Sequence, residues 1–335
     1  MSTTPSTFNA GLPAYTVVGG GKRNASSGIC AVLMNRGVMH RKSCFRELQK
    51  SGFDYVLSME NSGEHFDIEE LSGLFPFVRF ILFKEPVNIG QKINVAALEA
   101  DTPLFFVLWN DFCPVFNLDA ERIVSRLRVT NGEGNTGIAR LCTMPVIQKS
   151  DFELFPCARV PLFNGNGFES ATVIPVKEGT PSLYPFEAAG VYDRVRFINM
   201  GGFDTELNLP YWQFLDFGFR AWLWGEEIRC TQHIRFMVEA NGHTENYAAG
   251  GGYFRFYLKN LAPVIQWKNG KPDAHLPLRR FPPYLLKSGG SLLNAWRTFT
   301  RIRLWVASNG IRFVNDVNAV SRVLSTAGQP TATHL

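Results

Sequence analysis

A carboxylate and a carboxamide stand directly after a strongly apolar run near residue 110. Residues 103–108 read PLFFVL, and Trp109 is followed by Asn110 and Asp111. A continuous apolar run of this kind is typical of a strand buried on both faces of a parallel sheet. Ligands of open α/β sheets bind just beyond the carboxyl ends of such strands. Asp111 is therefore predicted to hold a hard divalent cation on a phosphate, although a strand-end Asp also commonly caps the helix that follows it.

Strand-like and helix-like segments alternate on both sides of this run. Apolar runs predict strands, and apolar residues at helical spacing predict the helices between them. This alternation predicts an α/β fold with a mostly parallel, doubly wound sheet and helices on both faces. The expected strands are 29–34, 54–59, 77–83 and 103–108, and the expected helices are 41–51, 67–74 and 91–99.

The second half of the chain is less regular. We expect a flexible segment at 1–27, a main domain at 28–275, and a basic, aromatic, helical extension at 276–335. The expected strands here are 136–144, 171–175 and 228–237, and the expected helices are 120–128, 211–224, 255–259 and 291–306.

Composition narrows the class of protein. The chain has 335 residues, of which 45% are hydrophobic, so it can bury a large core. No apolar run approaches the length of a membrane span, and the first residues do not resemble a secretory signal, which predicts a cytoplasmic protein. The six cysteines have no paired spacing and are expected to be reduced thiols. No G-x-G-x-x-G sequence follows the first strand, which argues against a dinucleotide-dependent oxidoreductase.

The charge of the chain is concentrated near its end. The net charge is +5, and residues 278–335 hold eight Lys or Arg against one Asp, so the remainder of the chain carries −2. Aromatic residues lie between these arginines, which predicts either a helix on the surface of an anionic membrane or a helix packed on the body with its arginines in water. No nucleic-acid-binding module accompanies the basic residues, so no nucleic-acid partner is expected.

Several short motifs follow one another in order along the chain. The first is the acidic Glu60 after the second strand. An N-x-G-x-x-x-N turn and helix follows at 88–94, Asp111 stands at the end of an Asp-x-Asp position, and G-G-F-D occupies 201–204. The helix at 213–220 and a late His243 complete the series. In this order the motifs resemble those of the family 2-type glycosyltransferases of the GT-A fold, and the resemblance covers roughly residues 29–260.

The resemblance implies a site for a nucleotide sugar, most simply a UDP-sugar, with Mn²⁺ or Mg²⁺ held by Asp111 and His243. Trp212 offers a flat face to a sugar ring. The residues expected to bind substrate are Glu60, Asn88, Gly90, Lys92, Asn94, Gly201, Gly202, Asp204 and Trp212.

Two positions depart from the family pattern. Trp109 stands where the first Asp of the metal motif is expected, and Gln213-Phe214 replaces the Glu-Asp pair that commonly supplies the base. An inverting transferase needs a base to deprotonate the acceptor hydroxyl, and Asp216 is the predicted substitute, with Asp204 and Glu206 as alternatives.

Two functions follow from these residues. The first is transfer of one sugar to a hydroxyl of a glycan, lipid-linked or protein acceptor, in the cytoplasm or at the inner face of the membrane. The alternative is a catalytically degenerate relative that keeps the fold and acts as a binding or partner subunit.

Overall fold

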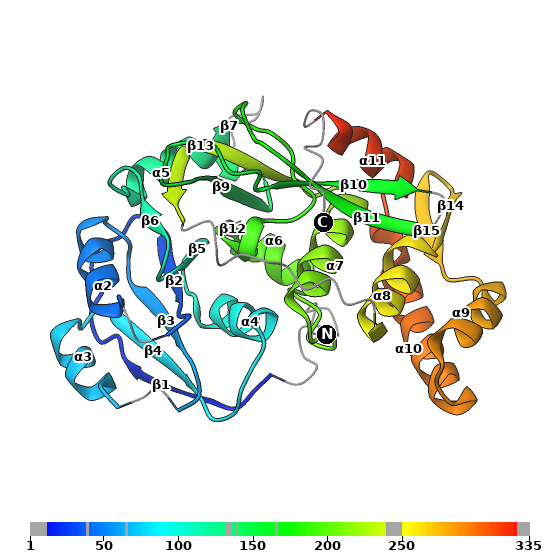
Figure 1. The fold of residues 1–335 in the computed structure, drawn as a ribbon, viewed down its shortest axis with the longest axis horizontal. Helices are drawn as coiled ribbons and strands as arrows, with labels where there is room; N and C mark the ends of the chain where they lie inside the picture. The colour runs from blue at the N-terminus through cyan, green and yellow to red at the C-terminus, as the bar shows by residue number, and fades with distance from the viewer. Residues whose placement is uncertain are drawn as a thin grey trace.

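A nine-stranded mixed sheet forms the centre of the computed structural model, which describes residues 12–37, 40–63, 66–130, 136–138, 140–164, 167–238 and 250–326. The strand order is β1-β4-β3-β2-β5-β12-β9-β13-β6 (Figure 1). The strands β2, β3, β4, β5, β9 and β13 run in one direction, and β1, β12 and β6 run against them. The predicted α/β class with a mostly parallel sheet is confirmed.

The N-terminal half alternates as the sequence predicts. Its strands are β2 (Ile29–Met34), β3 (Val56–Glu60), β4 (Val78–Phe83) and β5 (Leu104–Trp109), and its helices are α2 (Arg41–Lys50), α3 (Ile68–Leu74) and α4 (Ile89–Glu99). Every residue of β2 and β5 is buried, as expected for central strands of a parallel sheet. In Figure 1, α2 and α3 lie on one side of these strands and α4 lies on the other.

The segment predicted to be flexible contains an edge strand. β1 (Tyr15–Gly19) pairs antiparallel with β4, and Tyr15 lies opposite Phe83. The Tyr15 hydroxyl donates a hydrogen bond of 2.7 Å to Glu99, at the end of α4. Residues 15–19 of the segment predicted to be flexible thus form a strand, which is stabilised by pairing with β4 that its own Ser- and Gly-rich surroundings do not reveal.

The second half builds the other side of the sheet. The predicted single strand at 136–144 is two strands, β8 (Thr136–Ile138) and β9 (Cys142–Gln148). The predicted strand at 171–175 corresponds to the end of β11 (Gly167–Val173), which forms a hairpin with β10 (Ala158–Asn164). The elements are β6 (Cys113–Pro114), α5 (Ala120–Leu127), β7 (Arg128–Thr130), β8 (Thr136–Ile138), β9 (Cys142–Gln148), β10 (Ala158–Asn164), β11 (Gly167–Val173), η1 (Phe186–Ala188), β12 (Gly190–Asp193), α6 (Arg194–Asn199), α7 (Pro210–Leu223) and β13 (Ile228–Met237).

The last described residues form a helical lobe at one end of the sheet (Figure 1). The lobe begins with α8 and a π-helical turn, η3, where the sequence predicts a single helix at 255–259. Among the described residues, no helix is both long and apolar enough to cross a membrane. The elements are α8 (Gly250–Phe256), η3 (Tyr257–Leu261), β14 (Val264–Lys268), β15 (Lys271–His275), η4 (Leu278–Arg280), α9 (Phe281–Ser288), α10 (Leu292–Ser308), η5 (Gly310–Arg312) and α11 (Val317–Ser325).

Candidate functional site

Three loops meet where the parallel strands β2, β3 and β5 end. The Asn35 side chain, after β2, donates a hydrogen bond of 3.1 Å to Glu60 at the end of β3. Asn110, after β5, accepts from the backbone N–H of Arg36 at 3.1 Å and donates to the carbonyl of Gly37 at 2.8 Å. Polar side chains therefore converge at the edge of the sheet where ligands of α/β folds bind.

Arg36 forms the centre of this convergence. Its guanidinium contacts the carboxylates of Asp111 at 2.8 Å and Glu187 at 3.3 Å, and it lies 4.0 Å from the centroid of the Trp109 ring. The Trp109 ring nitrogen donates a hydrogen bond of 2.9 Å to the carbonyl of Glu187. Arg36 and Asp111 are about one-third exposed, at 34% and 36% of their side chains. The cluster is thus fixed by mutual contacts and still accessible to a ligand.

Sequence reasoning missed Arg36 and Glu187. Glu187 and Ala188 both adopt left-handed backbone conformations, with φ of 51° and 56°. Such conformations cost free energy in residues other than glycine and cluster at functional sites. Nothing in the local sequence marks Glu187, because η1 reaches Trp109 only through the fold.

A cavity of about 860 Å³ opens beside Asp111. This volume falls in the range of small-molecule sites. Its walls come from the loop after β2, from α2, from the loop after β5, and from the end of β13, and include Arg36, His40, Cys44, Asn110, Asp111 and Val238.

Asp111 is the described residue best suited to hold a divalent cation here. One of its carboxylate oxygens pairs with Arg36, and the other, Oδ1, is buried without a hydrogen-bond partner among the described residues. An unpartnered buried carboxylate oxygen fits a ligand of a hard cation. Within the described ranges, no group of three or more His, Cys, Asp or Glu side chains is arranged to hold a metal ion. The predicted second ligand, His243, lies outside the described residues.

Glu60 lies below the surface of this edge. Its side chain is fully buried and accepts hydrogen bonds from Arg41 and Ser58, each at 2.5 Å. Burial raises the pKa of the Glu60 carboxyl, although Ser58 and Arg41 act in the opposite direction. Lys92, also buried, donates a hydrogen bond of 2.5 Å to Asn61, the residue after Glu60. In this arrangement both residues fix the loop after β3.

The predicted turn and helix at 88–94 is occupied by protein contacts. Asn88 caps α4 by accepting from the N–H of Gln91 at 2.9 Å, and the Gln91 side chain accepts from the N–H of Asn88. The N–H of Gly90 donates to Oε1 of Gln213 at 3.0 Å. A Cβ at Gly90 would approach that of Phe203 to 2.8 Å, so only glycine fits there. The first turn of α4 thus binds side-chain acceptors rather than facing a ligand.

Asn94 and Gln213 connect α4 to the G-G-F-D loop and to α7. Asn94 exchanges two hydrogen bonds of 2.9 Å with the backbone of Phe203. Gln213 accepts from Gly90 and also donates from Nε2 to the carbonyl of Leu207 at 2.6 Å. A carboxylate could make the first contact but could not donate the second. The amide at position 213 therefore has a structural role that the base of the family pattern could not fill.

The two aspartates of the pattern form a buried ion-pair network. Asp204 binds Lys259 at 2.6 Å and Arg255 at 2.7 Å, and Asp216 binds Lys259 at 2.9 Å and Arg220 at 3.2 Å. Burial acts to raise the pKa of Asp204, but Lys259 and Arg255 outweigh it and hold this pKa well below its usual range. Asp216 is fully buried and does not line the cavity beside Asp111.

The remaining predicted residues belong to the same buried region. Gly201 and Gly202 have positive φ of 80° and 61°, and the carbonyl of Gly202 accepts from Arg220 at 2.7 Å. The Trp212 ring is buried and contacts the Tyr211 ring, with centroids 4.9 Å apart. Of the predicted site residues that the structure describes, Asp111 lines the cavity, and Glu60 and Lys92 lie buried beside the loop after β3. The others belong to α4, the G-G-F-D loop and α7, away from that cavity.

No protein-family model matches the chain, and no curated protein matches it. Among solved structures, the chain is similar to GalNAc-T7 with UDP, GalNAc and Mn²⁺, with a TM-score of 0.48 and 12% identity over 68% of this chain and 48% of that chain. It is also similar to the mannosyltransferase PcManGT from Pyrobaculum calidifontis in complex with GDP-Man and Mn²⁺, with a TM-score of 0.45 and 8% identity over 89% of this chain and 79% of that chain. This chain thus spans about half the length of the first structure. At these scores, no activity follows from the likeness.

Proposed function

We propose that this chain is a GT-A-type glycosyltransferase that binds a nucleotide sugar, most simply a UDP-sugar, at the carboxyl ends of β2, β3 and β5. The observation that carries the proposal is the cluster of Arg36, Trp109, Asp111 and Glu187 beside the 860 Å³ cavity. The cavity can accept a nucleoside, and the cluster lies where the strands end.

Transfer of a sugar from a nucleotide sugar would require this site to stabilise the diphosphate that leaves. The guanidinium of Arg36 is planar and suited to phosphate oxygens. Its orientation is fixed by the Trp109 ring and by the carboxylates of Asp111 and Glu187. Asp111 would hold Mn²⁺ or Mg²⁺ through its unpartnered oxygen, with His243 as the further ligand that the family resemblance implies. Such an ion would neutralise the charge that develops on the leaving diphosphate.

The acceptor is proposed to be a hydroxyl of a glycan, lipid-linked or protein molecule. The base predicted for it, Asp216, is buried and paired with Lys259, so it requires a rearrangement of that network to act on an acceptor. Glu187 shares Arg36 with Asp111 and its side chain is 16% exposed, and we propose it as the alternative base.

A catalytically degenerate binding or partner subunit is the second candidate function. The observation that favours it is the structural role of Gln213, whose amide contacts both Gly90 and Leu207. A protein of this class would bind the nucleotide and turn over no sugar.

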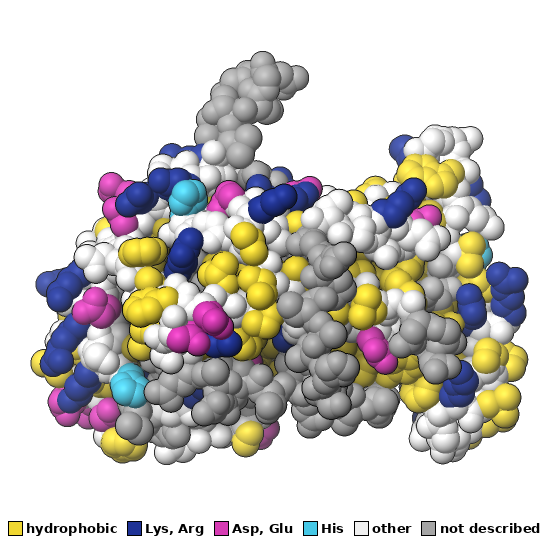
Figure 2. All heavy atoms as spheres, turned by 45° about the horizontal axis from the view of Figure 1, so that its top comes forward, with side chains coloured by type: hydrophobic (Ala, Val, Ile, Leu, Met, Phe, Trp, Pro, Cys, Tyr) yellow, Lys and Arg dark blue, Asp and Glu magenta, His cyan; other side chains and the backbone are white. Residues whose placement is uncertain are grey.

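We propose that the helical lobe contacts an anionic membrane surface. In this proposal the protein is cytoplasmic and binds the inner face of the membrane. No residue of α9 is buried, and Leu286 and Leu293 are 85% and 69% exposed. Lys287 and Arg297 lie beside them in the sequence and are exposed as well. Apolar and basic side chains are interleaved on this lobe, at the right of Figure 2, as in helices that lie in a membrane interface.

The experiment that tests the proposed activity is release of UDP from UDP-glucose, UDP-galactose and their N-acetylated forms, with Mn²⁺ and without acceptor. Slow hydrolysis that is lost in Asp111→Ala would support a transferase. Binding of UDP without hydrolysis or transfer of any of these sugars would favour the degenerate subunit.

A further inference from the structure

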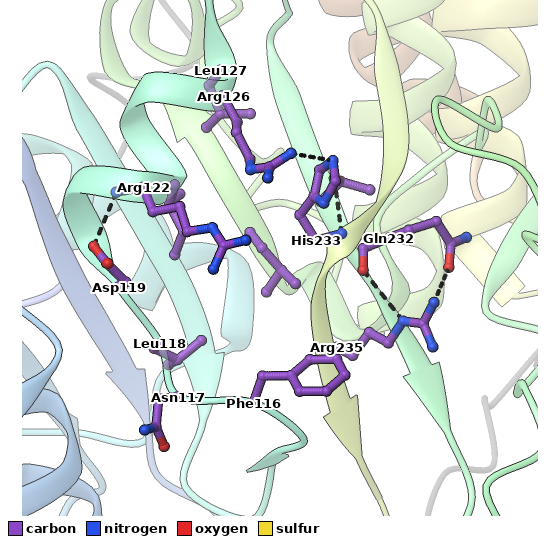
Figure 3. Close-up of a pocket in the computed structure, with 13 residues that line it drawn as sticks. Phe116, Asn117, Leu118, Asp119, Arg122, Arg126, Leu127, Gln232, His233 and Arg235 are labelled. Carbon is purple, nitrogen blue, oxygen red and sulfur yellow. Dashed lines mark hydrogen bonds between the residues drawn. The ribbon is translucent and has the colours of Figure 1, made fainter.

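A second cavity, of about 320 Å³, lies between α5 and β13 (Figure 3). Leu118 lines both this cavity and the one beside Asp111, so the two lie on either side of the loop before α5. The two cavities share no other wall residue, and Arg36, Asp111 and Glu187 do not line the second cavity.

Two arginines face this cavity from one side of α5. Arg122 and Arg126 are four residues apart, which places their side chains on the same helix face, and Figure 3 shows both extending toward β13. Asp119 is the carboxylate in the wall, and it caps α5 by accepting from the backbone N–H of Arg122 at 3.0 Å. Across the described ranges, neither guanidinium has a carboxylate oxygen within ion-pair distance. The positive charge of this helix face is therefore available to an anion.

β13 supplies further polar groups through a bulge. Its register with β9 shifts between Thr231 and Arg235, which directs the intervening residues out of the regular ladder. The Nε2 atom of His233 lies 2.8 Å from a guanidinium nitrogen of Arg126 and accepts its hydrogen bond, because a guanidinium only donates. Arg235 is fixed by two hydrogen bonds to Gln232, of 3.3 and 3.0 Å. The bulge thus positions Arg126 and adds a third guanidinium to the wall.

Apart from the polar Asn117 and Thr231, the rest of the wall is apolar. Ile123 and Ile234 are buried and Leu118 and Leu127 are half-buried, while Phe116 is exposed at the edge. A ligand that suits this cavity has one compact anionic group for the arginines and a small apolar body for the isoleucines.

We propose that this cavity binds a small organic phosphate ester, with the phosphate on Arg122 and Arg126 and the apolar part against Ile123 and Ile234. Guanidinium groups pair bidentately with phosphate or carboxylate oxygens. A phosphate monoester offers two arginines three terminal oxygens and about two negative charges, whereas a carboxylate offers two oxygens and one charge. The volume limits the apolar part to about the size of one ring, since it lies at the lower end of ligand-site volumes, which begin at about 300 Å³.

Calorimetric titration of the full chain with phenyl phosphate at 0.15 M salt tests this proposal. The variants are Arg122→Gln/Arg126→Gln and, as a matched control for surface charge, Arg297→Gln on α10. Both arginines of α5 and Arg297 are exposed, so all variants should keep the melting temperature of the wild type. Phenol and benzoate serve as probes without the phosphate.

The expected result is saturable binding of one phenyl phosphate per chain, weakened at least tenfold in the double variant and unchanged in Arg297→Gln. Phenol and benzoate should bind at least tenfold more weakly than phenyl phosphate. Absence of saturable binding, or equal affinity in the double variant, would overturn the site. Benzoate binding as tight as that of phenyl phosphate would overturn the assigned ligand class.

Discussion

The guanidinium of Arg36 lies 4.0 Å from the centre of the Trp109 ring. Trp109 stands where the family pattern places the first carboxylate of its metal motif, and it presents an aromatic face to a cation instead. The ring nitrogen of Trp109 also donates a hydrogen bond to the backbone carbonyl of Glu187, whose carboxylate pairs with Arg36. The tryptophan at position 109 therefore helps to hold the positively charged guanidinium of Arg36 in the site.

Trp109→Phe and Trp109→Leu separate the two contributions of this residue. Phenylalanine keeps an aromatic face but loses the hydrogen bond to Glu187, which should lower the free energy of unfolding by about 1 kcal/mol. Leucine also loses the cation–π contact with Arg36, for a further loss of about 1 kcal/mol. Urea unfolding at pH 7 measures both. Equal stability of the two variants would contradict the role of the ring as a support for Arg36.

Gln213→Glu should destabilise the protein rather than restore a base. The new carboxylate would face the carbonyl of Leu207, to which the amide now donates, in a fully buried position. We expect a loss of about 2 kcal/mol in the free energy of unfolding, the scale of an unsatisfied buried polar group. Gln266→Glu on the exposed face of β14 is the matched control and should change stability little. A Gln213→Glu variant as stable as wild type would show that the two amide contacts are dispensable.

Asp204 should make stability depend on acid pH. Its pKa is held below the usual value because Lys259 and Arg255 outweigh burial, so the ionised form stabilises the folded state above the unfolded pKa, near pH 4. This contribution is lost as the pH falls through the lower folded pKa. Asp204→Asn should therefore cost about 3 kcal/mol at pH 7, with the difference from wild type narrowing toward pH 3.

Urea unfolding across this pH range provides the check on Asp204. Asp273→Asn is the control, because Asp273 pairs with Lys268 in an exposed hairpin and should leave stability unchanged. A difference between Asp204→Asn and wild type that is constant from pH 7 to pH 3 would contradict the ion-pair account.

Leu286→Ser/Leu293→Ser should remove binding to anionic vesicles. Both leucines are exposed on the α9–α10 lobe, and together they supply the apolar area that an interfacial helix buries. Flotation with vesicles of phosphatidylcholine and phosphatidylserine should recover the wild type and lose the variant. Leu304→Ser, an exposed leucine farther along α10, is the control and should float. Flotation of the double variant at the wild-type level would exclude the lobe as the contact.

The strands and helices of the N-terminal half could be predicted from the sequence. The runs at β2 and β5 are uninterrupted and fully buried, and the ends of the elements in this half differ from the prediction by at most two residues. β1 could not be predicted in this way, because its stability comes from pairing with β4 and not from its own composition.

The candidate site was predictable only where local sequence marks it. Asp111 follows an uninterrupted apolar strand and lies on the cavity wall. Asp216 and Gln213 belong to the same series of motifs as Asp111. They are buried through contacts with Lys259, Asn260 and Gly90, which come from distant parts of the chain. Arg36 gains its role through Glu187, which is 151 residues away.

The central claim is that the cluster around Asp111 binds a nucleotide. Its most direct test is calorimetric titration of the wild type and of Asp111→Ala with UDP, GDP and CMP, each with and without Mn²⁺. We predict binding of UDP that Mn²⁺ strengthens, and at least a tenfold loss of that Mn²⁺-dependent affinity in Asp111→Ala. Absence of binding by any of the three nucleotides to the folded wild-type protein would contradict the proposed site.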